Sequence, residues 1–176
     1  MAKLSTKTRD SNPKVIVFGP PKVGKTQLAG DLAEHFNLLW VDLESGWETL
    51  LKLPLDWQER VELICLPDSR QYPIACETML KLIKFKASNI CETHGKIDCA
   101  VCKKVPDAGW VMVDLGNVPE DTIVVIDSLT QLANSIMAFV CKNQPDDYKP
   151  DWEDYRTCGT LMDMFLSAIQ QAPFKV

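Results

Sequence analysis

The clearest chemical signal in this sequence is at positions 19–26, which read G-P-P-K-V-G-K-T and fit the pattern G-x-x-x-x-G-K-T. Backbone N–H groups of such a loop point inward and bind an anion, and the N-terminus of the following helix adds positive charge. Gly24 lets the backbone approach a phosphate, Lys25 is spaced to reach the outer phosphates, and the Thr26 hydroxyl suits Mg²⁺. The alternative, a chance glycine turn, is disfavoured by the strand and the helix expected on either side. The predicted nucleotide-binding residues are Gly19, Pro20, Pro21, Lys22, Val23, Gly24, Lys25, Thr26 and Gln27.

The magnesium shell of such a loop needs a carboxylate at the end of a neighbouring buried strand. Asp127 directly follows the apolar run T-I-V-V-I and precedes Ser128. Asp and Ser are also common just before a helix, so Asp127 could cap the next helix, with or without a metal role. We predict that Asp127 and Thr26 bind Mg²⁺.

Hydrolysis also needs a group that orients and deprotonates water. Many P-loop ATPases place a glutamate directly after the metal-binding aspartate, but here Ser128 holds that position, so the base must come from elsewhere. The run W-V-D-L-E-S-G places Asp42 and Glu44 at the carboxyl end of a second strand, where ligands bind in open α/β sheets. Either acid is a candidate base, and the alternative for Glu44 is a solvated acid in a loop.

A second chemical signal is a group of three cysteines and one histidine within twelve positions, in the order C-x₂-H-x₄-C-x₂-C. Two tight pairs joined by a short turn suit a closed, tetrahedral, structural Zn²⁺ site. The segment around them has few apolar residues, so a metal would supply much of its folding free energy. The alternative is a chance cluster of ordinary thiols. The predicted zinc ligands are Cys91, His94, Cys99 and Cys102, and the cysteines at 65, 76, 141 and 158 are expected to be buried thiols.

These residues need elements to position them, and apolar periodicity predicts alternating strands and helices. A strand, the glycine loop, a helix and another strand make a βαβ unit, which gives parallel strands. The polar, cysteine-rich stretch at 88–109 fits neither a helix nor a strand pattern. The expected strands are 14–18, 38–43, 61–66, 110–115 and 122–126, and the expected helices are 25–36, 73–86, 128–140 and 152–170.

Over residues 13–66 and 120–176 the chain resembles the RecA-like ATPases, which include the bacterial recombinases, the KaiC-like proteins and the RecA-core ATPases of bacteriophages. The run V-D-L-E matches the aliphatic-D-A-E end of the second core strand in bacterial recombinases, and I-V-V-I-D-S-L matches their metal-binding strand. The resemblance implies that Glu44 is the catalytic base, acting with Lys25. Bacteriophage RecA-core ATPases, some of them single-strand annealing proteins, suit the compact size and the G-P-P-K-x-G-K-T loop best.

The resemblance implies an α/β P-loop NTPase fold with a RecA-like, mostly parallel sheet flanked by helices, and the Cys/His spacing adds a small zinc-knuckle insert. We expect a flexible arm at 1–12 and one ATP-binding domain at 13–176, with the zinc-binding insert at 88–109. The insert lengthens the interval between the phosphate loop and Asp127 beyond that of a minimal RecA core. Residues 174–176 look like the start of a further central strand, so one hypothesis is that the domain is truncated at its C-terminus.

Net charge and the pattern of apolar residues limit how the protein could bind DNA and where it is expected in the cell. The net charge of −5 argues against a basic surface for duplex DNA, although single-stranded DNA could bind a local strip or an assembled homo-oligomer. The N-terminus lacks the apolar core of a secretory signal and no run is long enough to span a bilayer, so we expect a cytoplasmic protein, in the host cytoplasm if phage-encoded. We predict Mg²⁺-dependent ATP hydrolysis serving DNA recombination. The alternatives are a nucleotide-binding interaction module with little turnover or a small-molecule kinase.

The insert has alternative roles. It could clasp the domain, contact another subunit, or touch single-stranded nucleic acid through Lys96, Lys103 and Lys104. The clasp is the favoured interpretation.

Overall fold

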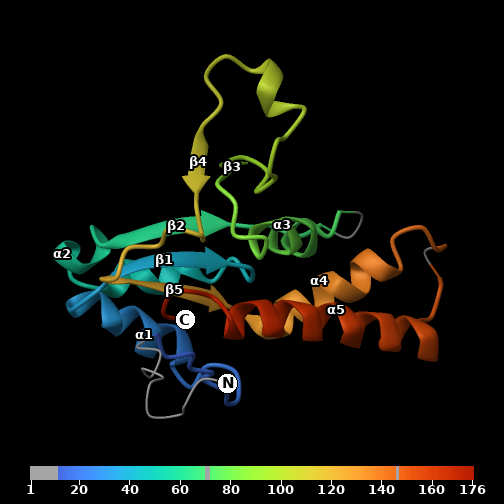
Figure 1. Ribbon diagram of the computed structural model, residues 1–176, viewed down its shortest axis with the longest axis horizontal. Helices are drawn as coiled ribbons and strands as arrows, with labels where there is room; N and C mark the ends of the chain where they lie inside the picture. The colour runs from blue at the N-terminus through green and yellow to red at the C-terminus, as the bar shows by residue number, and fades with distance from the viewer. Residues whose placement is uncertain (1–11, 70–71, 146) are drawn as a thin grey trace, which may run out of the picture.

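The computed structural model describes residues 12–69, 72–145 and 147–176 (Figure 1). The arm expected at 1–12 lies outside the described residues, apart from Asn12. Three parallel strands form the main sheet in the order β2-β1-β5, with β1 spanning Asn37–Asp42, β2 Val61–Cys65 and β5 Thr122–Asp127. The expected α/β class with a parallel sheet flanked by helices is therefore confirmed.

The central strand β1 is buried on both faces, as a parallel strand between helical layers should be. Leu39 and Val41 pack on one face, in the main apolar cluster with residues of α3, α4 and α5. Leu38 and Trp40 pack on the other face, in a smaller cluster with residues of η2 and η3. Helical elements thus cover both faces of the sheet and hold its carboxyl ends in place.

The remaining elements agree with most of the expected positions but not with all of their lengths. The element bounds are α1 Lys25–Gly30, η2 Asp31–Glu34, η3 Trp47–Lys52, α2 Leu55–Gln58, α3 Ile74–Leu82, β3 Ser88–Cys91, η4 Cys102–Lys104, β4 Trp110–Val113, α4 Leu129–Val140 and α5 Trp152–Gln170. The helix expected at 25–36 ends at Gly30 and continues as a 3₁₀ turn. Leu28 and Leu32, expected on its apolar side, are 59% and 39% exposed.

The insert is more regular than the sequence indicated. Strands β3 and β4 pair antiparallel and form a separate two-stranded sheet, and η4 follows the second cysteine pair. Periodicity missed β3 because the strand has only four residues, three of them ligand-type or polar. The insert extends beyond β2, the edge strand of the main sheet (Figure 1).

The strand expected at 14–18 is not formed, which corrects the sequence prediction. Its apolar side chains are exposed, reaching 91% for Phe18. The stretch pairs with a neighbour only near its start, where Val15 N–H donates to the carbonyl of Val176 at 2.8 Å and Val176 N–H donates to Pro13 at 3.2 Å. A β-branched run becomes a strand only where a neighbouring segment hydrogen-bonds along its length. This stretch has such a neighbour only near its start, so the pairing ends there.

Residues 174–176 lie between that stretch and β5. Lys175 forms a parallel bridge with Ile123, and its carbonyl accepts from Val124 N–H at 3.0 Å. Phe174 is 2% exposed and its ring meets Phe85 edge-on at 6.0 Å. The segment therefore lies alongside β5, where the sequence predicted a further central strand to begin.

Candidate functional site

The phosphate loop is an exposed turn that connects residues 12–18 to α1. Gly24 has a φ of 91°, in the left-handed region that favours glycine, and Lys22 has a φ of 64°. A Cβ at Gly24 would meet nothing within 4 Å, so backbone conformation rather than space requires glycine there. The structure thus gives a local reason for the glycine that the motif demands.

Lys25 closes over this loop. Its Nζ donates to the carbonyl oxygens of Gly19 at 3.1 Å and Pro20 at 3.0 Å. These carbonyls are neutral acceptors, and phosphate oxygens form stronger, charge-assisted hydrogen bonds with an ammonium group. The loop and its lysine therefore fit an anionic phosphate ligand. The last residue of the predicted set, Gln27, instead donates to Asp31 within the helical segment, at 2.7 Å.

The structure brings together the two predicted magnesium ligands, which lie 101 residues apart in sequence. The hydroxyl of Thr26, at the start of α1, donates to Oδ2 of Asp127, at the end of β5, at 2.9 Å. The pKa of Asp127 is raised overall, and burial is the largest cause. The hydrogen bond from Thr26 lowers this pKa, while the nearby Glu44 and Asp42 carboxylates raise it further. A hydroxyl and clustered carboxylate oxygens form the hard donor set that Mg²⁺ prefers, so these residues fit that ion.

Asp42 and Glu44, the two candidate bases, occupy different environments. Asp42 is 1% exposed, and its carboxylate accepts backbone N–H bonds from Glu44 at 3.0 Å, Gly46 at 3.2 Å and Trp47 at 3.1 Å. It therefore shapes the loop that follows β1 and is closed to solvent. Glu44 is exposed on that loop and so remains accessible to water.

Ser128 connects Glu44 to the neighbouring strand. Its hydroxyl donates to Oε1 of Glu44 and accepts from Gln131 N–H at 3.3 Å, as the N-cap of α4. Sequence reasoning noted Ser128 in place of a glutamate and in the D-S pair, but gave its side chain no role in the site. The D-S pair at the end of β5 was the available signal. Parallel pairing aligns Asp42 with Asp127, so the segments that follow these two residues, which carry Glu44 and Ser128, lie close together.

The Cys/His cluster forms as predicted. The four ligand atoms of Cys91, His94, Cys99 and Cys102 all lie within 4.8 Å of one another, and this donor set could hold a metal ion such as zinc. Backbone N–H groups of Cys102 and Val101 lower the pKa of the Cys99 thiol to about 6, against the effect of burial. A thiol with a lowered pKa is more readily present as the thiolate that binds metal.

The four other cysteines lie outside this cluster. Cys76 is buried, as expected, and burial raises its pKa to about 12. Cys65, Cys141 and Cys158 are only half-buried, which corrects the prediction for these three, although burial is still the main factor raising each pKa.

Three features together define a P-loop nucleotide-binding protein of the α/β class. They are a glycine loop before a helix, an acidic residue at the end of β5, and a parallel sheet between helices. Residues 11–176 match the model of the AAA domain, so the chain belongs to the AAA domain family. The family indicates a nucleotide-binding protein of the ATPase type. No curated protein and no solved structure matched the chain. Among the described helices, none is long and apolar enough to cross a membrane.

Proposed function

We propose that this chain binds ATP with Mg²⁺ and hydrolyses it, with Glu44 as the base. The observation that carries the proposal is the hydrogen bond between Thr26 and Asp127, with Glu44 held beside it by Ser128. Oxygen donors from three separate elements meet at the carboxyl ends of β1 and β5. Ligands of open α/β sheets bind at this edge.

Each residue has a distinct role in the proposed reaction. Backbone N–H groups of the loop and the Lys25 ammonium bind the phosphates, while Thr26 and Asp127 supply the metal ligands. Magnesium, when bound, neutralises charge on the phosphate oxygens. Glu44 orients a water molecule and accepts its proton, and the Ser128 hydroxyl holds the Glu44 carboxylate in position.

The biological role we propose is DNA recombination or handling of single-stranded DNA, by a homo-oligomer in the cytoplasm. It rests on the resemblance of V-D-L-E and I-V-V-I-D-S-L to the bacterial recombinases, in which the residue matching Glu44 is the base, and on the compact size and G-P-P-K-x-G-K-T loop that suit the bacteriophage RecA-core ATPases. The net charge of −5 makes a local, assembled binding surface more suitable for DNA than the whole molecular surface.

The described arginines disfavour a small-molecule kinase. Such enzymes use arginines to cover the transferred phosphate, but Arg60 donates to the carbonyls of Ala33 and Glu34 and Arg156 pairs with Glu153. A nucleotide-binding module with slow turnover is the second candidate. It is favoured by the exposed stretch at 14–18, because a phosphate loop without a preceding strand is less firmly positioned.

An ATPase assay of the whole chain tests these proposals. We expect release of free phosphate that requires Mg²⁺ and falls by at least about 100-fold in Lys25→Ala. Lys52→Ala, an exposed change in η3 outside the loop, is the matched control and should retain most activity. Stimulation by single-stranded DNA, measured alongside oligomer mass, would support the DNA role. A phosphorylated acceptor would overturn hydrolysis in favour of a kinase, and tight ATP binding without turnover would select the binding module.

A further inference from the structure

The geometry of the Cys/His cluster points to a specific ion and a specific role. We propose that Cys91, His94, Cys99 and Cys102 bind one structural Zn²⁺, and that this site locks the insert onto α3 and the end of β2. The proposal is independent of nucleotide hydrolysis, because no residue of the phosphate site takes part.

The distances match a tetrahedral zinc site. The Nδ1 atom of His94 lies 3.2 Å from Sγ of Cys102, 3.7 Å from Sγ of Cys99 and 3.9 Å from Sγ of Cys91. A tetrahedron with Zn–S bonds of about 2.3 Å and a Zn–N bond of about 2.0 Å separates nitrogen from each sulfur by about 3.5 Å. The three nitrogen–sulfur distances therefore bracket the separation in a tetrahedral zinc site, with His94 binding through Nδ1.

The backbone holds each pair of ligands in a similar turn. In the first pair, Gly95 N–H donates to the carbonyl of Cys91 at 2.9 Å, and in the second, Lys103 N–H donates to the carbonyl of Cys99 at 3.0 Å. The residue four positions after the leading cysteine thus closes both turns. Gly95 has a φ of 63°, which fits the requirement for glycine in the first turn.

The interior of this part of the insert consists largely of the ligands themselves. Cys91, Cys99 and Cys102 are at most 5% exposed, and among the described residues Ala108 and Trp110 are the partly buried apolar ones that pack against this cluster. Such a small apolar cluster provides little burial to offset the entropy of ordering the chain. Four protein ligands also leave no open coordination position, so the ion would be structural.

The first turn is anchored directly to the main domain. The Thr78 hydroxyl of α3 donates to the carbonyl of Gly95 at 2.8 Å in a buried hydrogen bond. A Cβ at Gly95 would lie 2.8 Å from the carbonyl oxygen of Cys65, so the turn packs closely against the end of β2. Lys96 lies over the ring of Tyr72 at 4.7 Å. Fixing the turn by metal binding therefore fixes its contacts with α3 and β2.

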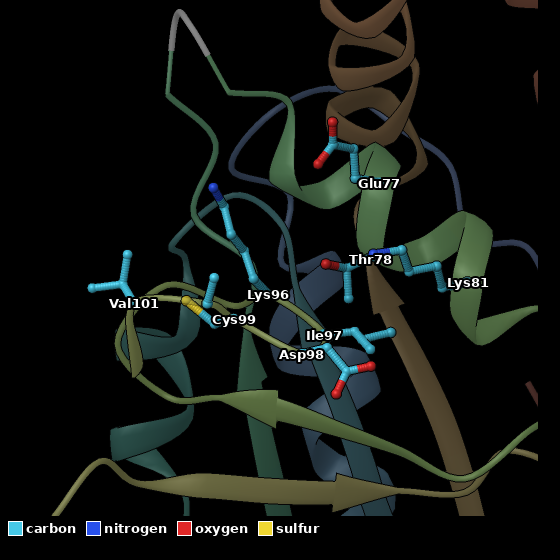
Figure 2. A pocket seen from close by; sticks show the side chains of 9 residues that line it. Glu77, Thr78, Lys81, Lys96, Ile97, Asp98, Cys99 and Val101 are labelled. Carbon is cyan, nitrogen blue, oxygen red and sulfur yellow. The ribbon is translucent and has the colours of Figure 1, made fainter. Parts of the chain in front are cut away.

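Figure 2 shows this junction. Glu77, Thr78 and Lys81 of α3 lie on one side of a cavity of about 270 Å³, and residues 96–101 of the insert form the other side. The buried Thr78–Gly95 hydrogen bond lies at this junction, and Ile90 and Ile97 of the insert pack in the same apolar cluster as residues of α3. The attachment of the insert to α3 should depend on that hydrogen bond and on the turn from Cys91 to Gly95, which the metal would fix.

Metal analysis of the whole purified chain tests the zinc site. We expect one zinc ion per chain in the wild type and in Cys141→Ser, whose thiol lies outside the cluster, but loss of the metal in Cys91→Ser. His94→Cys, which keeps four donors, should retain zinc. Replacement by Co²⁺ should give the visible absorption bands of a tetrahedral thiolate site. Wild-type protein that contains no zinc and does not bind added Zn²⁺ or Co²⁺ would overturn the site.

Hydrogen exchange of the wild-type chain tests the clasp without relying on a variant that might fail to fold. Removal of zinc by a chelator should cause loss of protection in residues 88–104 and also in α3, and readdition of Zn²⁺ should restore both. Thr78→Val should weaken protection at Gly95 while zinc stays bound, with Thr49→Val, in η3, as the control. Loss of protection confined to the insert would overturn the clasp. The clasp would also be overturned if removal of zinc left hydrogen exchange unchanged but abolished binding of single-stranded DNA. That result would make the insert a nucleic-acid contact.

Discussion

The phosphate site draws Thr26, Glu44 and Asp127 from three separate elements, whereas the Cys/His cluster draws all its ligands from residues 91–102. The first depends on the register between β1 and β5, and the second depends on two short turns. They also lie toward opposite edges of the main sheet, with the insert beyond β2 and α1 on the side of β5 (Figure 1). A distributed site is thus built by the domain core, while the local site, in our proposal, is completed by an ion.

The largest effect should follow from removing the base of the distributed site. Glu44→Gln keeps the shape and the hydrogen bond to Ser128 but removes the proton acceptor, so we expect hydrolysis to fall about 10²- to 10⁴-fold. ATP affinity should be retained, because the loop residues are unchanged. Steady-state rates and equilibrium ATP binding measure the two effects, with Glu48→Gln, an exposed change in η3, as the control. Hydrolysis at the wild-type rate in Glu44→Gln would show that the base is another residue.

Asp42→Asn should show how much the distributed site relies on buried polar contacts. The change removes the charge that accepts three backbone N–H groups, so we expect a loss of about 1–3 kcal/mol in the free energy of unfolding. The ATPase rate should also fall, since the same loop carries Glu44. Urea denaturation measures the stability change, and Asp107→Asn, at an exposed position of the insert, is the matched control. Equal stabilities for the two variants would contradict a structural role for Asp42.

Ser128→Ala should have a smaller effect on the same site. Loss of the N-cap is expected to cost about 1 kcal/mol of stability, and the Glu44 carboxylate loses the group that orients it. We expect a lower kcat with little change in ATP affinity, and recovery of the rate in Ser128→Thr, which restores the hydroxyl. If Ser128→Ala lowers stability but leaves kcat unchanged, Ser128 is only a helix cap.

The smallest effect should be the influence of the local site on the distributed one. Cys99→Ser removes a zinc ligand, yet it shares no partner with the phosphate loop, so ATP affinity should change by less than about 0.5 kcal/mol. Calorimetric titration with a non-hydrolysable ATP analogue measures this change in parallel with zinc content. A large loss of affinity in a folded Cys99→Ser variant would show that the two regions are coupled through β2 and the sheet.

Several expectations from the sequence differ from the structure, or were left open by the sequence, for identifiable reasons. The run at 14–18 has the composition of a strand, but strand formation needs a neighbour, and only its first residues have one. The insert was expected to lack regular structure because four-residue strands carry too little periodicity to detect. Asp42 and Glu44 could not be ranked by composition, because their burial depends on where the loop after β1 turns.

The sequence by itself determined the α/β class, the phosphate-loop motif and the cluster of four Cys and His residues that could hold a metal. Each of these depends on local periodicity or on residues close enough to meet through a short turn, where loop closure costs little. Only the tertiary structure decided that Thr26 meets Asp127, that Ser128 holds Glu44, and that Thr78 anchors the insert. Those contacts join residues from separate elements, and they exist only because parallel strand register and helix packing fix where distant backbone positions lie.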